Sequence, residues 1–192
     1  EHIAISAIGT DNPAVLNDLV ILATKNECLV QETRMTMMGN TQAVIMLVSG
    51  NWNTIAKMET ALKSFDNQAA LIYKRTKPTS LTQAVLPYLV QIIAVNRPGI
   101  LHEVTNFFVS QNCLIDDLQS TTYIANLSAV EMISITQRIG IDSNTNITDF
   151  REQFALLCDE LNIDGGMEPE KPIISCSLLN KYSREPSVTR RG

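Results

Sequence analysis

Two short turns in the 192-residue chain combine residue types that suit the binding of a small anionic group. The first reads Asp11-Asn12-Pro13-Ala14-Val15, and the second reads Asn96-Arg97-Pro98-Gly99-Ile100. Pro suits the first turn of a helix, because its missing N–H would have no partner there. The start of a helix offers unpaired N–H groups and a partial positive charge, which attract a carboxylate. These ten residues are therefore the candidate ligand-binding residues.

The two turns divide the favourable features between them. The first has an acidic residue, Asp11, but it has Ala14 at the position after Pro. The second has Gly99 at that position, where a missing side chain lets a ligand approach the backbone, but it has Asn96 in place of the acid. Ligand binding and plain helix capping both explain such turns, and both interpretations remain open at this point.

The turns belong to an internal repeat with an offset of 85 residues. At this offset Pro13 aligns with Pro98, Leu16 with Leu101 and Cys28 with Cys113. The apolar positions of the following helix also align, with Val15, Leu16, Leu19, Leu22 and Ala23 matching Ile100, Leu101, Val104, Phe107 and Phe108. Apolar residues three and four apart form one face of a helix. The chain is therefore interpreted as a tandem duplication.

Each copy is predicted to fold as β-α-β-β-α-β. In the first copy we expect strands at 2–8, 28–38, 42–49 and 68–74, a helix from Pro13, and a second helix capped near Asn51 or Asn53. In the second copy we expect strands at 88–95, 114–123, 128–137 and 167–175, helices at 98–111 and 148–161, and a polar loop at 140–146. Residues 29–31 and 114–116, at the start of each second strand, are expected to lie near the turns.

The pattern predicts an α+β protein of two ferredoxin-like domains, with antiparallel sheets and helices on one face. The predicted boundaries are 1–76 for the first domain, 77–85 for a linker, 86–175 for the second domain and 176–192 for a tail expected to be flexible. A homodimer is one way in which the open edges of such sheets can be covered.

Composition narrows the classes of function. Hydrophobic residues make up 45% of the chain, enough for a packed core. The net charge of −5 argues against direct nucleic-acid binding, which needs a high density of cations. No apolar run is long enough to span a bilayer, and no signal peptide is recognisable. The four cysteines show no metal-binding or redox spacing, so a reduced, cytoplasmic protein is expected.

Catalytic motifs are not found in the sequence. There are two histidines, His2 and His102, and there is no G-x-S-x-G elbow and no glycine-rich phosphate loop. No cluster of metal-ligating residues stands out either. We therefore expect a protein that is not an enzyme and has no catalytic residues, no metal and no cofactor.

The turns and two further segments resemble a known family. Besides the repeated turn, Met46-Leu47-Val48-Ser49-Gly50-Asn51-Trp52-Asn53 and Ala155-Leu156-Leu157-Cys158-Asp159-Glu160-Leu161-Asn162 are similar to segments of tandem ACT-domain proteins, in particular the glycine cleavage system transcriptional repressors. The resemblance covers about residues 2–175 and leaves out the tail.

The resemblance implies regulation without catalysis. ACT domains typically bind small amino acids at the first strand-to-helix turn, where Asp or Asn would hold the ammonium group. The repressors of this family act by binding a DNA-binding activator protein, in a glycine-responsive way. Two alternatives remain open: an allosteric regulatory subunit of an amino-acid metabolic enzyme, and an oligomerisation module without a ligand.

Overall fold

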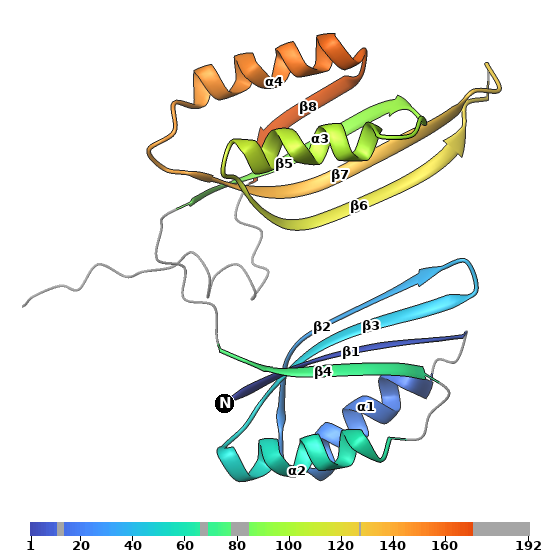
Figure 1. Ribbon diagram of the computed structural model, residues 1–192, viewed down its shortest axis with the longest axis vertical. Helices are drawn as coiled ribbons and strands as arrows, with labels where there is room; N and C mark the ends of the chain where they lie inside the picture. The colour runs from blue at the N-terminus through green and yellow to red at the C-terminus, as the bar shows by residue number, and fades with distance from the viewer. Residues whose placement is uncertain (11–13, 66–68, 78–84, 127, 171–192) are drawn as a thin grey trace, which may run out of the picture. The chain divides into compact units, whose positions relative to one another are not determined.

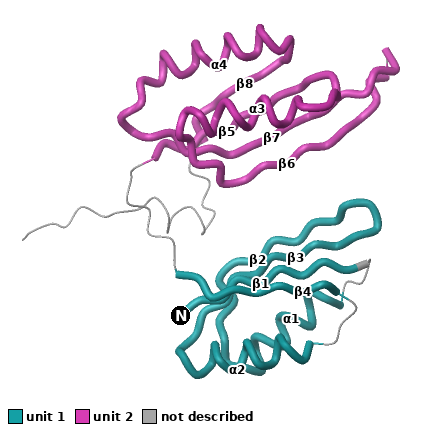
Figure 2. The backbone as a smooth tube through the Cα atoms, viewed as in Figure 1, with its two compact units in different colours: residues 1–80 teal, residues 81–192 magenta. Residues whose placement is uncertain are grey.

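The computed structural model describes residues 1–10, 14–65, 69–77, 85–126 and 128–170. The chain divides into two compact units, residues 1–80 and residues 81–192, each with its own hydrophobic core (Figure 2). The predicted tail, residues 176–192, and most of the predicted linker, residues 77–85, lie outside the described residues. Their boundaries stay predictions.

Unit 1 has a four-stranded antiparallel sheet in the order β2-β3-β1-β4, with both helices on one face (Figure 1). Its elements are β1 His2–Thr10, α1 Ala14–Lys25, β2 Leu29–Met38, β3 Thr41–Ser49, α2 Trp52–Lys63 and β4 Ala69–Thr76. Alternate residues of β1, namely Ile3, Ile5 and Ala7, are buried beneath the helices. Helix α2 is capped by the predicted Asn51, whose side chain accepts a hydrogen bond from the Thr54 N–H at 2.9 Å.

Unit 2 repeats this architecture in the order β6-β7-β5-β8, again with its helices on one face (Figure 1). Its elements are β5 Val85–Val95, α3 Ile100–Ser110, β6 Leu114–Ile124, β7 Glu131–Asp142, α4 Ile147–Leu161 and β8 Asp164–Pro169. Its core contains an aromatic cluster in which the Phe107 and Phe108 rings lie 5.1 Å apart, with Phe150 and Phe154 packed against them. The predicted ferredoxin-like fold of two βαββαβ units is confirmed.

Two irregular features of the backbone occur in both units at the 85-residue offset of the sequence repeat. The ladder between the second and third strands shifts register between Val30 and Glu32 in unit 1, and between Ile115 and Asp117 in unit 2. The residue before each strand-entry cysteine, Glu27 or Asn112, has a positive φ of 56° or 55°. The N–H groups of Cys28 and Cys113 then donate to the preceding helices over 2.9 Å.

Two predicted segments of unit 2 are wrong in extent. The expected polar loop at 140–146 begins later, because β7 continues to Asp142 and Gly140 pairs with both Pro87 and Leu114. The closing strand is Asp164–Pro169, so it starts three residues earlier than the predicted 167–175, and residues 171–175 of that prediction lie outside the described residues. Gly165 lies inside this strand because α4 packs against it: a Cβ there would lie 2.6 Å from the Cys158 Sγ. Gly165 thus allows close packing, and the glycine pair does not end the strand.

Candidate functional site

The turn of unit 2 leads from β5 into α3 and lies within the described residues. Gly99 is the N-cap of α3, with φ of 92°, a left-handed conformation that favours glycine. The cap has no side chain to accept a hydrogen bond from the first turn of the helix. Asn96 is tied to the sheet through its N–H, which donates to the Glu131 carbonyl over 2.9 Å. Pro98 is exposed, whereas Ile100 is 2% exposed and anchors the helix in the core.

An ion pair spans this turn. The Arg97 guanidinium donates through Nη1 to the Glu103 Oε1 over 3.0 Å and through Nη2 to Oε2. The hydrogen bonds to Arg97 hold the pKa of the Glu103 carboxyl below its usual range, and those to Glu103 raise the pKa of Arg97. A Cβ on Gly99 would lie 3.6 Å from the Glu103 Oε1. The Arg97 cation and the Glu103 anion thus lie side by side at this turn and are paired with each other.

Glu103 is missing from the candidate residues derived from the sequence. It belongs to the first turn of α3, six positions after Arg97, where an acidic residue also favours the helix dipole. An acid in the first helical turn after a basic turn residue is the signal that points to it.

The turn of unit 1 is only partly described. Asp11, Asn12 and Pro13 lie outside the described residues, and the candidate site resumes with Ala14, the first residue of α1. Val15 is 3% exposed and packs in the core, as Ile100 does in unit 2. Val15 and Ile100 therefore stand at corresponding places with their side chains buried, where they position the backbone of each turn.

The expectation that residues 29–31 and 114–116 lie near the turns is wrong. Leu29 pairs with Ser49, which pairs with His2 at the start of β1, whereas the turn follows Thr10 at the other end. The eight residue steps between them span about 26 Å of strand. Unit 2 has the same arrangement, with Leu114 paired to Gly140 and Gly140 to Pro87. The first helix returns the chain to the opposite end of the sheet, so the second strand starts there.

The far end of the second strand lies beside the turn instead. In unit 1 the last but one residue of β1, Gly9, pairs with Gln42 of β3, and Gln42 pairs with Met37 of β2. Gln42 is 4% exposed and its Nε2 contacts the Met35 Sδ. Its Oε1 is buried and has no hydrogen-bond partner among the described residues. Sequence patterning gave no sign of this residue, because a Gln in an otherwise apolar strand is usually exposed.

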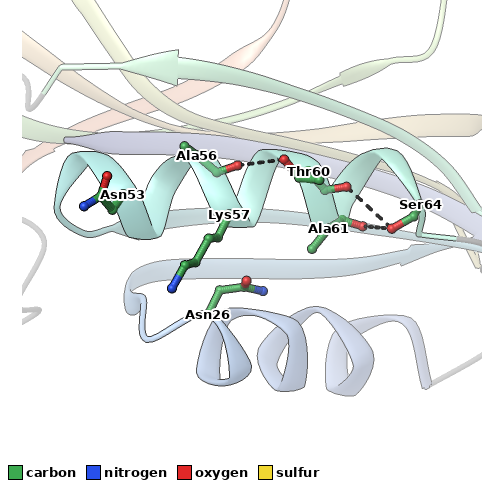
Figure 3. Close-up of a pocket in the computed structure, with 7 residues that line it drawn as sticks. All are labelled: Asn26, Asn53, Ala56, Lys57, Thr60, Ala61 and Ser64. Carbon is green, nitrogen blue, oxygen red and sulfur yellow. Dashed lines mark hydrogen bonds between the residues drawn. The ribbon is translucent and has the colours of Figure 1, made fainter.

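A shallow groove of about 630 Å³ lies at the other end of α1, between its C-terminal end and α2 (Figure 3). It is lined by Asn26, Asn53, Ala56, Lys57, Thr60, Ala61 and Ser64. The Thr60 and Ser64 hydroxyls donate to carbonyls of their own helix, at 3.0 Å to Ala56 and 3.0 Å to Ala61. None of the candidate turn residues that the structure describes lines the groove.

The thiols of the described cysteines are buried or partly buried. Burial raises the pKa of the Cys113 thiol to about 11 and also raises the pKa values of Cys28 and Cys158. A raised pKa keeps a thiol protonated and unreactive near neutral pH. Cys28 and Cys113 therefore behave as small core residues, as the sequence predicts.

The described part of the chain has neither a membrane-spanning helix nor a metal-ligand cluster. No helix there combines the length and apolarity needed to cross a lipid bilayer. Within the same residues, His, Cys, Asp and Glu side chains do not gather in threes as a metal site requires.

The sequence is similar to a known domain family and to two curated proteins. Residues 1–75 match the model of the ACT domain family. The chain is 25% identical over 168 residues to the glycine cleavage system transcriptional repressor of Escherichia coli (strain K12), covering 86% of this chain and 88% of the repressor. The repressor of Shigella flexneri matches to the same extent.

Solved structures match both units together. A crystal structure assigned provisionally as a glycine cleavage system transcriptional repressor is 28% identical, with a TM-score of 0.69, and the alignment covers 88% of this chain and 97% of that one. A protein of unknown function from Galdieria sulphuraria has a TM-score of 0.77 at 19% identity, with 89% and 99% covered. The second match concerns the fold alone. Residues 1–75 thus match the ACT domain family, and the chain is similar to the repressor along both units.

Proposed function

We propose that this chain represses the glycine cleavage system by binding a DNA-binding activator protein, and that a small amino acid, glycine in the first instance, controls this binding. The observation that carries the proposal is the similarity to the repressor of Escherichia coli (strain K12), which runs through both units and covers 88% of that protein. A protein that had only one ACT domain in common with this chain would match one unit and not 86% of the chain.

The charge of the chain supports a protein partner over DNA. Lys and Arg number 15 against 20 Asp and Glu, which gives a net charge of −5. Neutralising DNA phosphates requires clustered cations. The sequence similarity points to a repressor and not to an enzyme, and we propose that the chain has no catalytic activity.

The proposed ligand sites are the two turns. In unit 2 the carboxylate of the amino acid would lie at the first turn of α3, where Gly99 allows close approach and Arg97 adds a positive charge. The ammonium group would lie toward Glu103 and Asn96. In unit 1 the corresponding residues are Asp11, Asn12, Pro13, Ala14 and Val15 at the start of α1.

The partner surface that we propose is the open face of the unit 1 sheet. Ile8, Ile45 and Ile72 lie on this face and are 53%, 57% and 74% exposed. Exposed apolar residues gathered on one face are typical of protein interaction sites.

The proposal is tested by replacing the repressor in Escherichia coli with this chain. In a strain that lacks its own glycine cleavage repressor, expression of the chain should restore repression of a glycine cleavage reporter, and added glycine should change the level. The purified chain alone should not retard the reporter promoter DNA in a gel. Unrepressed reporter expression with the chain present would refute the proposal, and co-purification with a catalytic subunit would favour the enzyme-regulator alternative.

A further inference from the structure

We propose that Met35 is a site of reversible oxidation, at which a hydroperoxide converts the thioether to a sulfoxide and the new oxygen accepts a hydrogen bond from the buried amide of Gln42. The inference goes beyond the proposed function and does not depend on it. It concerns the hairpin of β2 and β3, all of whose residues the structure describes (Figure 1).

The Met35 sulfur lies where a small oxidant can reach it. Strand β2 is an edge strand of the unit 1 sheet, whose order is β2-β3-β1-β4. Met35 is 51% exposed, whereas Met46 and Met58 in the core of the same unit are 0% exposed. Because oxygen transfer needs direct contact between the peroxide and the sulfur, Met35 is open to oxidation in the folded protein and the two core methionines are not.

A buried amide is directed at this sulfur. Met35 pairs with Val44, which is 1% exposed, so its side chain lies on the helix-covered side of the sheet. Gln42 of β3 is 4% exposed, and its Nε2 donates to the Met35 Sδ over 2.8 Å. A thioether sulfur is only a weak acceptor. A stronger acceptor at this position would satisfy the buried donor better.

The proposed step supplies that acceptor. The Met35 sulfur attacks one oxygen of the hydroperoxide, so that an S–O bond forms and the O–O bond breaks. With hydrogen peroxide the second oxygen leaves as water. The sulfur loses two electrons and the peroxide gains two, so the step needs no other reactant. A half-exposed side chain has room to withdraw by the length of one S–O bond, which places the new oxygen where the sulfur lay.

The arrangement predicts an unusual effect of oxidation. A methionine sulfoxide is polar and usually disrupts apolar packing. At Met35 the sulfoxide oxygen would instead connect β2 to β3 through Gln42, and oxidation should stabilise unit 1. Met37 is a matched comparison, since it lies on the same side of β2, is 46% exposed and pairs with Gln42. Among the described residues the Gln42 amide donates to the sulfur of Met35 and not to that of Met37.

Unit 2 has neither member of this pair. Met35 corresponds to Ser120, and Gln42 corresponds to Ile133. The site is therefore assigned to unit 1 alone.

The experiment treats the full chain with hydrogen peroxide and then with dithiothreitol, which reverses disulfide and sulfenic acid formation at cysteines and leaves sulfoxides in place. Two variants each keep one methionine in β2: Met37→Leu with Met38→Leu keeps Met35, and Met35→Leu with Met38→Leu keeps Met37. Mass spectrometry of peptides locates the added oxygen. We expect oxygen on Met35 or Met37 in the respective variant and none on Met46 and Met58.

Thermal unfolding before and after oxidation provides the deciding readout. The variant that keeps Met35 should melt about 4 °C higher after oxidation, because it gains a better hydrogen bond. The variant that keeps Met37 should not melt higher. Reduction by methionine sulfoxide reductases should reverse the rise. Adding Gln42→Leu to the variant that keeps Met35 should abolish the rise, because the donor is gone.

Each comparison is made between the oxidised and reduced forms of one variant, so the stability of the variant itself does not affect the result. An unchanged or lower melting temperature on oxidation of Met35 overturns the inference, as does a rise that survives Gln42→Leu. Equal rises in the two variants, or a Met35 that resists peroxide while Met37 is oxidised, also overturn it. None of these outcomes bears on repression, so the proposed function is tested separately.

Discussion

The open faces of the two sheets differ although their backbones correspond rung by rung. The middle rung of the open face in unit 1 consists of Arg34, Ile45, Ser6 and Ile72, and the same rung in unit 2 consists of Gln119, Thr136, Gln91 and Gly166. Two exposed isoleucines in one unit thus correspond to a threonine and a glycine in the other. The next rung of unit 2 is charged, and its Arg138 lies 3.9 Å from Asp117 and 3.2 Å from Glu170.

The two sides of each sheet are under different constraints. The helix-covered side has to fill a core, so both units keep apolar residues there, such as Ile5 and Val90, which share a repeat position. The open side has no such requirement within a unit, so it follows the needs of contact and solubility. The duplicated units thus share a scaffold but differ in their surfaces.

The packing of the last strand against the second helix also differs between the two units. A substitution there should have the largest effect on stability. The rung Ala7 and Leu71 of unit 1 corresponds to Ile92 and Gly165 of unit 2. Gly165→Val should destabilise unit 2 by about 3 kcal/mol, since its Cβ would lie 2.6 Å from the Cys158 Sγ. Hydrogen exchange followed by mass spectrometry should show faster exchange in unit 2 peptides only.

Gly166→Ala is the control for this change. A Cβ on Gly166 would have no atom within 4 Å, so exchange should stay close to wild type. If Gly165→Val exchanged as slowly as wild type, the close packing of α4 on β8 would be refuted.

The central strands provide a second contrast, between Met46 and Gln137. Met46 pairs with Ile5 and Thr33, and Gln137 pairs with the corresponding Val90 and Leu118. Met46→Gln should cost unit 1 about 2 kcal/mol, because it buries an amide without a partner. Gln137→Met should raise the stability of unit 2 by about 1 kcal/mol. Urea unfolding of each variant measures both, and a loss of stability in Gln137→Met would contradict the contrast.

The two strand-entry cysteines predict different responses to alkaline pH. Burial raises the pKa of Cys113 to about 11, from an ordinary value of 9.0. Because the folded state holds the proton more tightly, the stabilisation is complete below about pH 9 and is lost as the pH rises toward 11. The pKa of Cys28 is also raised by burial, but a hydrogen bond involving Thr54 opposes the shift.

Hydrogen exchange between pH 8 and 11, corrected for the intrinsic rate, should therefore show a steeper loss of protection in unit 2. Cys113→Ala should remove part of that loss, and Cys28→Ala should change less. Identical slopes in Cys113→Ala and wild type would contradict this assignment.

Substitutions on the open face of unit 1 should have the smallest effect on stability and a clear effect on repression. Ile45→Thr copies the residue found at Thr136 and should change the free energy of unfolding by no more than about 0.5 kcal/mol, because Ile45 is 57% exposed. Repression of the reporter should weaken if this face binds the activator. Full repression by Ile45→Thr together with Ile72→Thr would exclude this face as the partner surface.

The sequence predicts the fold well because its signals are local and repeated. Alternation in 2–8, the Asn51 cap and the aligned apolar positions each specify one element, and the structure contains them. The end of β7 and the place of β8 were mispredicted, because Gly140 and Gly165 are selected by packing partners distant in sequence. Glu103 has a local signal six positions from Arg97, whereas the burial of Gln42 depends on its pairing with Gly9, which is distant in sequence.

The register shift shared by both units carries a historical consequence. It lies between Val30 and Glu32 in one unit and between Ile115 and Asp117 in the other, at matching repeat positions. Bulges are conserved within families of related folds. The irregularity was therefore already present in a single-unit ancestor before the gene was duplicated.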